Sequence, residues 1–354
     1  RPDGSLHIGE AVSVRNPDVL PLPATELVEQ RYYRRNKKAA AVVVASRGCP
    51  LKCTYCSMGA SSALNYRKRS IASVRREIEI AVHRHQVGFI DFEDENLSLD
   101  RKWFLRLLDE ITPCFPGQFP ELRAMNGLLP SSLDEQVVAA MQTAGFRTLN
   151  LSLGTTSKAQ QRQFQRPDVL GAFENALDLA RTYNLEAVGY IIVGAPFQEA
   201  AESLNDLLYL AARRVLVGTS VFYPSPGSKD YMLCAALGLL PNDFSGMRSS
   251  ALPVSHRTTR KESATLLRLS RIINFMKSIV DSGRPLPAPA PAADCITNPG
   301  DRDNAGLQLL QFFLHDGIIR GVDPDGDVFA HEIDLELSKK FLAGLKSIKI
   351  KGCR

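Results

Sequence analysis

The sequence predicts an α/β fold in which six strand–helix repeats form a parallel barrel, closed or partly closed. Short apolar runs alternate along residues 39–235 with longer segments whose apolar residues recur at helical spacing. Strands that alternate with helices form parallel sheets with right-handed crossovers. The chemically distinctive residues follow the predicted strands, and the active sites of such barrels lie at the C-terminal strand ends.

Each predicted strand is an apolar run, and a predicted helix follows nearly every one. Between residues 70 and 86, for example, Ile71, Val74, Ile78 and Val82 recur near helical spacing. Gly145 ends another helix, because glycine tolerates the positive φ found after a helix C-terminus. The strands are expected at 41–45, 88–92, 122–125, 148–153, 187–193 and 217–222, and the helices at 70–86, 101–111, 133–144, 169–183 and 200–213.

The regions outside the repeats differ in composition. We divide the chain into an N-terminal linker (1–38), the barrel (39–235), a C-terminal helical extension (236–283), a proline-rich linker (284–293) and a small C-terminal unit (294–354). The extension contains an amphipathic helix at 258–279, and the linker composition favours extended conformations. The acidic segment 323–327 has its glycine in the wrong place for a calcium loop, so we expect a polar hairpin turn there.

Composition and charge indicate a globular enzyme with a large core. The 354 residues are 44% hydrophobic, and the formal charge of +5 is small for this length. The Lys/Arg clusters are short, so we expect a solvated surface and no nucleic-acid partner. No apolar run approaches the roughly 20 residues of a membrane span, and no signal-peptide pattern opens the chain. The expected location is cytoplasmic.

Three of the seven cysteines, Cys49, Cys53 and Cys56, share one loop directly after the first predicted strand. A structural zinc site would need further ligands at suitable spacing. A disulfide framework is a poor alternative for a chain of this length. A four-iron cluster normally takes four cysteine ligands, so three would leave one iron open to a ligand that is not protein. We therefore predict these three residues as metal ligands.

The CxxxCxxC spacing, with Tyr55 before the last cysteine, resembles the signature of the radical S-adenosylmethionine (radical SAM) superfamily. In that family the open iron of a [4Fe–4S] cluster binds S-adenosylmethionine (SAM), and reductive cleavage releases a 5′-deoxyadenosyl radical that abstracts hydrogen. The resemblance implies a TIM-like partial (β/α)6 parallel barrel, an electron donor such as flavodoxin or ferredoxin, and Tyr55 as a cofactor contact. A non-catalytic iron–sulfur protein is the alternative from another class.

The loop after the second strand, 91–96, is dense in acids that a core would not hold unpaired. It resembles the F-x-D-D/E-N form found in the family, which implies that Asp94 or Glu95 binds the methionyl ammonium of SAM. The alternative is a solvated turn that caps the next helix through Ser98 or Asp100. After the third strand, Asn126 precedes a glycine that allows close backbone approach to a ligand, and it is a further candidate.

The fourth and fifth strands end in segments that resemble the remaining cofactor contacts of the family. The likeness implies that Ser152 and Arg166 hold the SAM carboxylate, a task that suits the planar fork of arginine. A surface role for Arg166 is the alternative. Ile192 and Gly194 match the strand whose backbone pairs with adenine, although Phe197 follows where relatives have glycine.

Two further segments resemble the cobalamin-dependent branch of the family: the P-x-P-G run at 224–227 and the proline-containing linker at 16–33. No Asp-x-His-x-x-Gly motif of a cobalamin-binding domain occurs in this chain. The resemblance implies methylation of an unactivated carbon, with cobalamin held by a domain outside this chain. The alternative is a cobalamin-free radical SAM enzyme that forms a C–C or C–S bond in a peptide or small-molecule substrate.

Overall fold

Six parallel strands form the wall of an open barrel in the computed structural model, which describes residues 14–29, 33–35, 37–60, 66–115, 120–247, 252 and 254–353. They form two sheets, of order β1-β2-β5-β6 and β7-β8-β9, and β1 is antiparallel to β2. Isolated parallel bridges join β6 to the residue pair just before β7, at Phe146, and the loop after β6 to the middle of β7. Within the described residues no pairing joins β9 to β2, so the predicted partial barrel is confirmed. The strands are β1 (Arg34–Arg35), β2 (Lys38–Val43), β5 (Val87–Phe92), β6 (Glu121–Ala124), β7 (Thr148–Gly154), β8 (Glu186–Val193) and β9 (Leu216–Val221).

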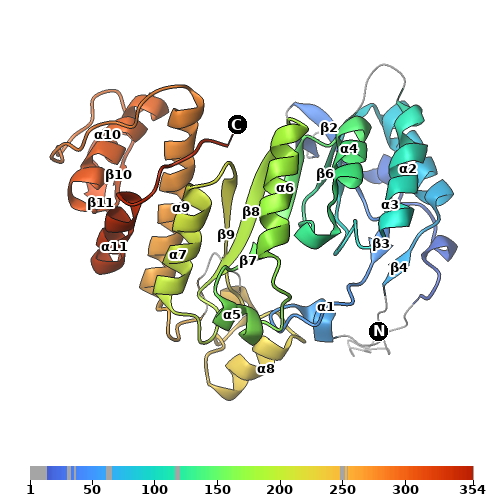
Figure 1. Ribbon diagram of the computed structural model, residues 1–354, viewed down its shortest axis with the longest axis horizontal. Helices are drawn as coiled ribbons and strands as arrows, with labels where there is room; N and C mark the ends of the chain where they lie inside the picture. The colour runs from blue at the N-terminus through green and yellow to red at the C-terminus, as the bar shows by residue number, and fades with distance from the viewer. Residues whose placement is uncertain are drawn as a thin grey trace, which may run out of the picture.

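Helices cover the outer face of this wall, and each predicted helix is present (Figure 1). The ends of the elements differ from prediction by a few residues; the first strand, expected at 41–45, is Lys38–Val43. Gly145 has φ 110° after α4, as the helix-ending role requires. The covering helices are α2 (Ile71–His85), α3 (Arg101–Ile111), α4 (Glu135–Ala144), α6 (Leu170–Thr182) and α7 (Ala200–Ala211).

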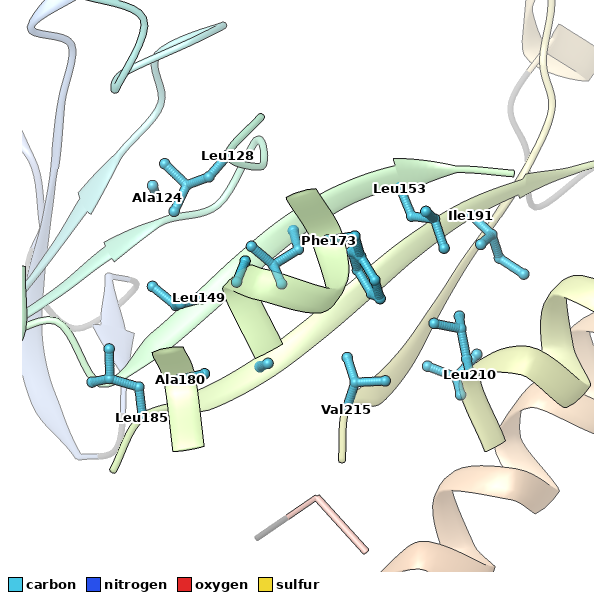
Figure 2. Packing of buried hydrophobic residues seen from close by; sticks show 14 of the residues in the cluster. Ala124, Leu128, Leu149, Leu153, Phe173, Ala180, Leu185, Ile191, Leu210 and Val215 are labelled. Carbon is cyan, nitrogen blue, oxygen red and sulfur yellow. The ribbon is translucent and has the colours of Figure 1, made fainter. Parts of the chain in front are cut away.

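The core lies between the strands and these helices. On β7 the residues Leu149, Leu151 and Leu153 are buried in it, because alternate side chains of a strand point to opposite faces. Figure 2 shows Leu153 at the end of α6 that carries Phe173, which is also fully buried, and Leu149 toward the end that carries Ala180. Burying each such side chain stabilises the fold by about 1.5–3 kcal/mol. The polar residues between the leucines therefore face the inside of the barrel.

The long helix α9 (Arg260–Asp281) packs beside α7 and β9 (Figure 1). It begins with a capping box formed by Thr259 and Glu262. Its Lys277 is fully buried, and the Nζ donates to the carbonyls of Ala211 (3.1 Å), Arg213 (2.6 Å) and Lys351 (2.8 Å). This lysine caps the C-terminal end of α7 and holds the C-terminal tail against it.

The C-terminal unit adds its side chains to the same core. Phe313 and Phe341 are buried in the cluster that also contains the barrel leucines. Asp323 accepts hydrogen bonds from the backbone N–H groups of Asp325 (3.0 Å) and Asp327 (2.9 Å), so the predicted polar hairpin turn is confirmed. The elements here are α10 (Arg302–Asp316), β10 (Arg320–Val322), β11 (Val328–Ala330) and α11 (Leu335–Leu345). The domain boundaries given above stay predictions.

Several short elements near the strand ends were not predicted. They are the pair β3 (Ser46–Arg47) and β4 (Arg67–Lys68), and the helices α1 (Ser57–Ala60), α5 (Lys158–Gln163) and α8 (Lys229–Ala236). They are too short for hydrophobic periodicity to reveal. None of the described helices is both long and apolar enough to cross a membrane.

Candidate active site

A cavity of about 350 Å³ lies where the loops after β2, β5, β6 and β7 converge. The predicted metal ligands and five of the eight predicted cofactor contacts line it. The lining residues are Cys49, Leu51, Cys53, Tyr55, Cys56, Met58, Glu95, Asn96, Asn126, Gly127, Leu129, Ser152 and Arg166. The parallel strands bring these residues together from four separate parts of the sequence, at the C-terminal edge that the fold predicts.

The three cysteines contribute free thiols to this cavity. Burial raises the pKa of the Cys49 thiol. Within the described residues, which include all seven cysteines, no three His, Cys, Asp or Glu side chains are grouped to hold a single metal ion. Each iron of a cubane cluster takes its own thiolate, so three cysteines spread around one cavity suit a cluster better than a single ion. No other cysteine lines the described cavity.

The cysteine loop is anchored by the residues next to its thiols. Thr54 donates its backbone N–H to the carbonyl of Phe164 (3.0 Å) and its hydroxyl to Asp230 of α8 (3.0 Å). The backbone N–H of Asp230 in turn donates to the carbonyl of Thr54 (2.9 Å). The ring of Tyr55 packs edge-on against Phe164, with centroids 5.0 Å apart. These contacts fix the loop against α5 and α8.

Arg166 joins the cysteine loop to β7. Its guanidinium donates to the Tyr55 hydroxyl (2.9 Å), to the Ser152 hydroxyl (2.9 Å) and to the Ser152 carbonyl. Arg166 is only 8% exposed, and its Nε has no hydrogen-bond partner. A Cβ on Gly154, which has φ 83°, would stand 3.0 Å from this Nε, so glycine gives the side chain its room. The surface alternative for Arg166 is wrong, and a buried cation faces the cavity.

Asp94 and Glu95 have different surroundings although they are neighbours. Asp94 is 3% exposed and accepts hydrogen bonds from the Ala45 N–H (3.1 Å), the Ser46 N–H and the Ser46 hydroxyl (2.6 Å). Burial raises its pKa to about 6. Both of its oxygens serve to hold the end of the first strand, and it does not line the described cavity. Glu95 does line it, and accepts from the backbone N–H of Gly48 (3.0 Å).

Asn96 lines the cavity, although the sequence predicted no role for it. It is buried, and its Oδ1 has no hydrogen-bond partner. Its position at the end of the F-x-D-D/E-N segment was the sequence signal from which a role in the site could have been predicted. Asn126 is exposed in the cavity, next to Gly127 at φ 96°. The capping role expected for Ser98 or Asp100 is confirmed for Asp100, which caps α3 by accepting from the Trp103 N–H (3.1 Å).

The end of β8 has an unusual backbone conformation. Phe197 has φ 64°, in the left-handed region that bulky residues rarely adopt. Its N–H donates to Nδ1 of His256 (3.1 Å), which holds this conformation in place. The Gln198 side chain donates to the carbonyl of Ile192 (2.9 Å). Ile192 and Gly194 are not among the residues that line the cavity, and their contact with adenine stays a prediction.

Residues 43–207 match the model of the radical SAM superfamily. Among curated proteins, an uncharacterized methyltransferase of Pyrococcus horikoshii is 23% identical over 229 residues, which cover 64% of this chain and 49% of the relative. An anaerobic magnesium-protoporphyrin IX monomethyl ester cyclase of Rubrivivax gelatinosus is 28% identical over 186 residues, which cover 52% of this chain and 32% of the relative. The chain thus spans half or less of the length of these relatives.

A similar fold occurs in a solved structure. The radical SAM methyltransferase TsrM from Kitasatospora setae, solved with cobalamin and a [4Fe–4S] cluster bound, superposes with a TM-score of 0.51. The two chains are 19% identical, and the match covers 58% of this chain and 41% of that chain. At this identity the likeness establishes the fold alone.

Proposed function

Residues 43–207 of this chain belong to the radical SAM superfamily, and from that premise we propose that the protein cleaves SAM reductively at a [4Fe–4S] cluster. The observation that carries the proposal is the meeting of Cys49, Cys53, Cys56 and Arg166 in one cavity with no fourth cysteine. Bound together, the cluster and SAM supply a carbon-centred radical that abstracts hydrogen from a substrate. The residues of this chain bind and orient those groups.

The cavity offers complementary charges for the two ends of the methionyl group of SAM. Arg166 is buried and has an Nε without a partner, which suits a carboxylate. Glu95 lies in the same cavity, and its carboxylate suits the ammonium. Ser152 and Tyr55 hold the guanidinium in place from two sides. We therefore assign the ammonium to Glu95 and leave Asp94 with the role of holding Ala45 and Ser46.

Within this class we favour cobalamin-dependent methylation of an unactivated carbon. Two observations support it: one curated relative is named a methyltransferase, and the structure of the methyltransferase that shares the fold has cobalamin bound. The second candidate is a cobalamin-free enzyme that forms a C–C or C–S bond. The likeness to a protein named as a cyclase favours that candidate.

The test of SAM cleavage is anaerobic reconstitution followed by reduction with dithionite. The wild-type protein should hold about four irons and convert SAM to 5′-deoxyadenosine. The triple variant C49A/C53A/C56A should hold no cluster and form no 5′-deoxyadenosine, whereas the control C114A/C295A, altered outside the cavity, should behave as wild type. Four irons in the triple variant would overturn the ligand assignment.

The subtype is tested on the chain expressed with any coding sequence that precedes it. Stoichiometric cobalamin, together with S-adenosylhomocysteine and 5′-deoxyadenosine as products, would support methylation. Formation of 5′-deoxyadenosine without cobalamin or S-adenosylhomocysteine would support the cobalamin-free candidate instead.

A further inference from the structure

Three polar residues, Asp91, Arg123 and Asn150, lie on the inner face of the barrel, and they are called the polar group here. Asp91 of β5 stands directly opposite Arg123 of β6 in the sheet register, so their side chains share one face. Ile90 and Phe92, on either side of Asp91, are buried in the core on the other face. Val42, opposite Asp91 on β2, is 48% exposed, so solvent reaches the neighbouring strand at this level.

Asn150 of β7 extends the group toward the cavity. Its strand neighbours Leu149 and Leu151 are in the core, so Asn150 and Ser152 share the inner face. Ser152 lines the cysteine cavity. Two residues along a strand span roughly 7 Å. Asn150 therefore lies about that far from Ser152, on the side of the cavity toward the N-terminal end of β7.

Each residue of this group keeps one buried polar atom without a hydrogen-bond partner, although Asp91 also interacts with the Met125 backbone and with the neighbouring Arg123 charge. Asp91 is 7% exposed, and its Oδ1 accepts no hydrogen bond. Asn150 is fully buried, and its Nδ2 donates none. The Nε of Arg123 is buried and also lacks a partner. Proteins pair their buried polar groups, so two donors and one acceptor left open on one face indicate a ligand that supplies the complements.

The orientation of Asn150 is fixed from the side. The Tyr190 hydroxyl donates to its Oδ1 (3.1 Å), which leaves the Nδ2 as the free end. Tyr190 itself lies across Gly218 of β9, where an added Cβ would come within 2.6 Å of the ring. Glycine at this position therefore lets the tyrosine reach Asn150. The group is arranged before any ligand arrives, and preorganisation reduces what binding costs.

We propose that this face binds the substrate of the radical reaction, and that the substrate has a free α-ammonium and a free α-carboxylate, as in an α-amino acid. The ammonium would lie against Asp91, and the carboxylate against Arg123 and Asn150. An anion alone would draw Arg123 away from Asp91 and leave that carboxylate uncompensated, and an uncharged apolar ligand would leave the three open atoms without partners. A zwitterion satisfies both signs. The proposal rests on the proposed function, because it names the substrate of that same site.

Equilibrium dialysis of the cluster-reconstituted protein against an equimolar mixture of the twenty common L-α-amino acids tests this, with retention read by mass spectrometry. At least one amino acid should be retained. Its N-acetyl and carboxamide derivatives should each bind at least tenfold more weakly, a comparison that needs no variant. D91N and R123M should weaken binding at least tenfold, whereas the surface controls D178N and R106M should not.

Retention of none of the twenty would overturn the proposal, and so would equal binding of the two derivatives. Unchanged binding in folded D91N and R123M, with folding checked by circular dichroism, would also overturn it. The proposed function is read separately from 5′-deoxyadenosine formed by the wild-type protein. Amino-acid binding without formation of 5′-deoxyadenosine would refute the radical activity and support the zwitterion site. Formation of 5′-deoxyadenosine without amino-acid binding would support the radical activity and refute the zwitterion site.

Discussion

Replacing Asp94 and Glu95 one at a time by alanine should separate an effect on stability from an effect on SAM affinity, although the two carboxylates are adjacent in the chain. Asp94 accepts three hydrogen bonds at the end of the first strand and lies outside the cavity. Glu95 lines the cavity and accepts one backbone N–H. D94A should therefore reduce the free energy of unfolding, whereas E95A should reduce SAM affinity. The two variants control for each other, because each removes one carboxylate.

The magnitudes follow from these contacts. In D94A three donors lose their partner, each at a cost of about 1–3 kcal/mol. Against that, the variant no longer buries a carboxylate whose pKa is raised to about 6, which returns about 3 kcal/mol near pH 7.5. The difference is a net loss of about 0–6 kcal/mol, with about 3 kcal/mol as the middle value. In E95A the loss of a bond to a charged group should weaken SAM binding by about 1.5–3 kcal/mol, or roughly 10- to 150-fold.

Urea unfolding of the cluster-free protein measures the first effect, and equilibrium dialysis of SAM against the reconstituted protein measures the second. Wild-type stability of D94A together with a fall in its SAM affinity would contradict the roles assigned to these two carboxylates. Wild-type SAM affinity of E95A would equally contradict them, because the ammonium must then lie against another group.

Three further predictions concern buried charges. R166K should retain the cluster yet bind SAM at least tenfold more weakly, as read by dialysis, because lysine cannot contact Tyr55, Ser152 and a carboxylate with one planar fork. Burial raises the pKa of Asp206 to about 6, above its unfolded value, so its charge lowers stability as pH rises from about 4 to 6. D206N keeps an acceptor for Thr156 and should raise the free energy of urea unfolding by about 1–3 kcal/mol at pH 7.5 and by little at pH 4; no gain at pH 7.5 would contradict this. Burial lowers the pKa of Lys277 to about 8, so wild-type stability should rise between pH 8 and 10, and K277M should lose that rise. Near pH 7 three carbonyls lose their donor in K277M, at about 1–3 kcal/mol each, whereas removal of the buried charge returns about 3 kcal/mol, so we expect a net loss of about 0–6 kcal/mol.

Much of the fold could be predicted because its signals are local. Alternation of Leu149, Leu151 and Leu153 with polar residues fixes both a strand and the face that it buries. The cysteine loop could be found from spacing alone. The short elements α5 and α8 could not, because one or two helical turns carry no periodic signal and depend on packing against the cysteine loop.

The site could be predicted only in part, because side-chain direction in a loop is set by tertiary contacts. Sequence left Asp94 and Glu95 as equal candidates, whereas the bonds from Ala45 and Ser46 and the lining of the cavity distinguish their surroundings. Asp91 was visible as one acid among several. Its position opposite Arg123 depends on the register between two strands that are far apart in the chain, which composition does not encode.

The anchoring of the cysteine loop has a consequence for how the holoprotein is assembled. Gly48, Thr54 and Tyr55 are tied to the β5 loop, to α8 and to Arg166 by bonds that involve no thiol. The loop therefore keeps its course before any iron arrives, in contrast to small metal domains that fold only around their ion. Cluster insertion therefore follows the folding of the polypeptide chain. Loss of the cluster to oxygen should then leave a folded apoprotein that is ready to be refilled.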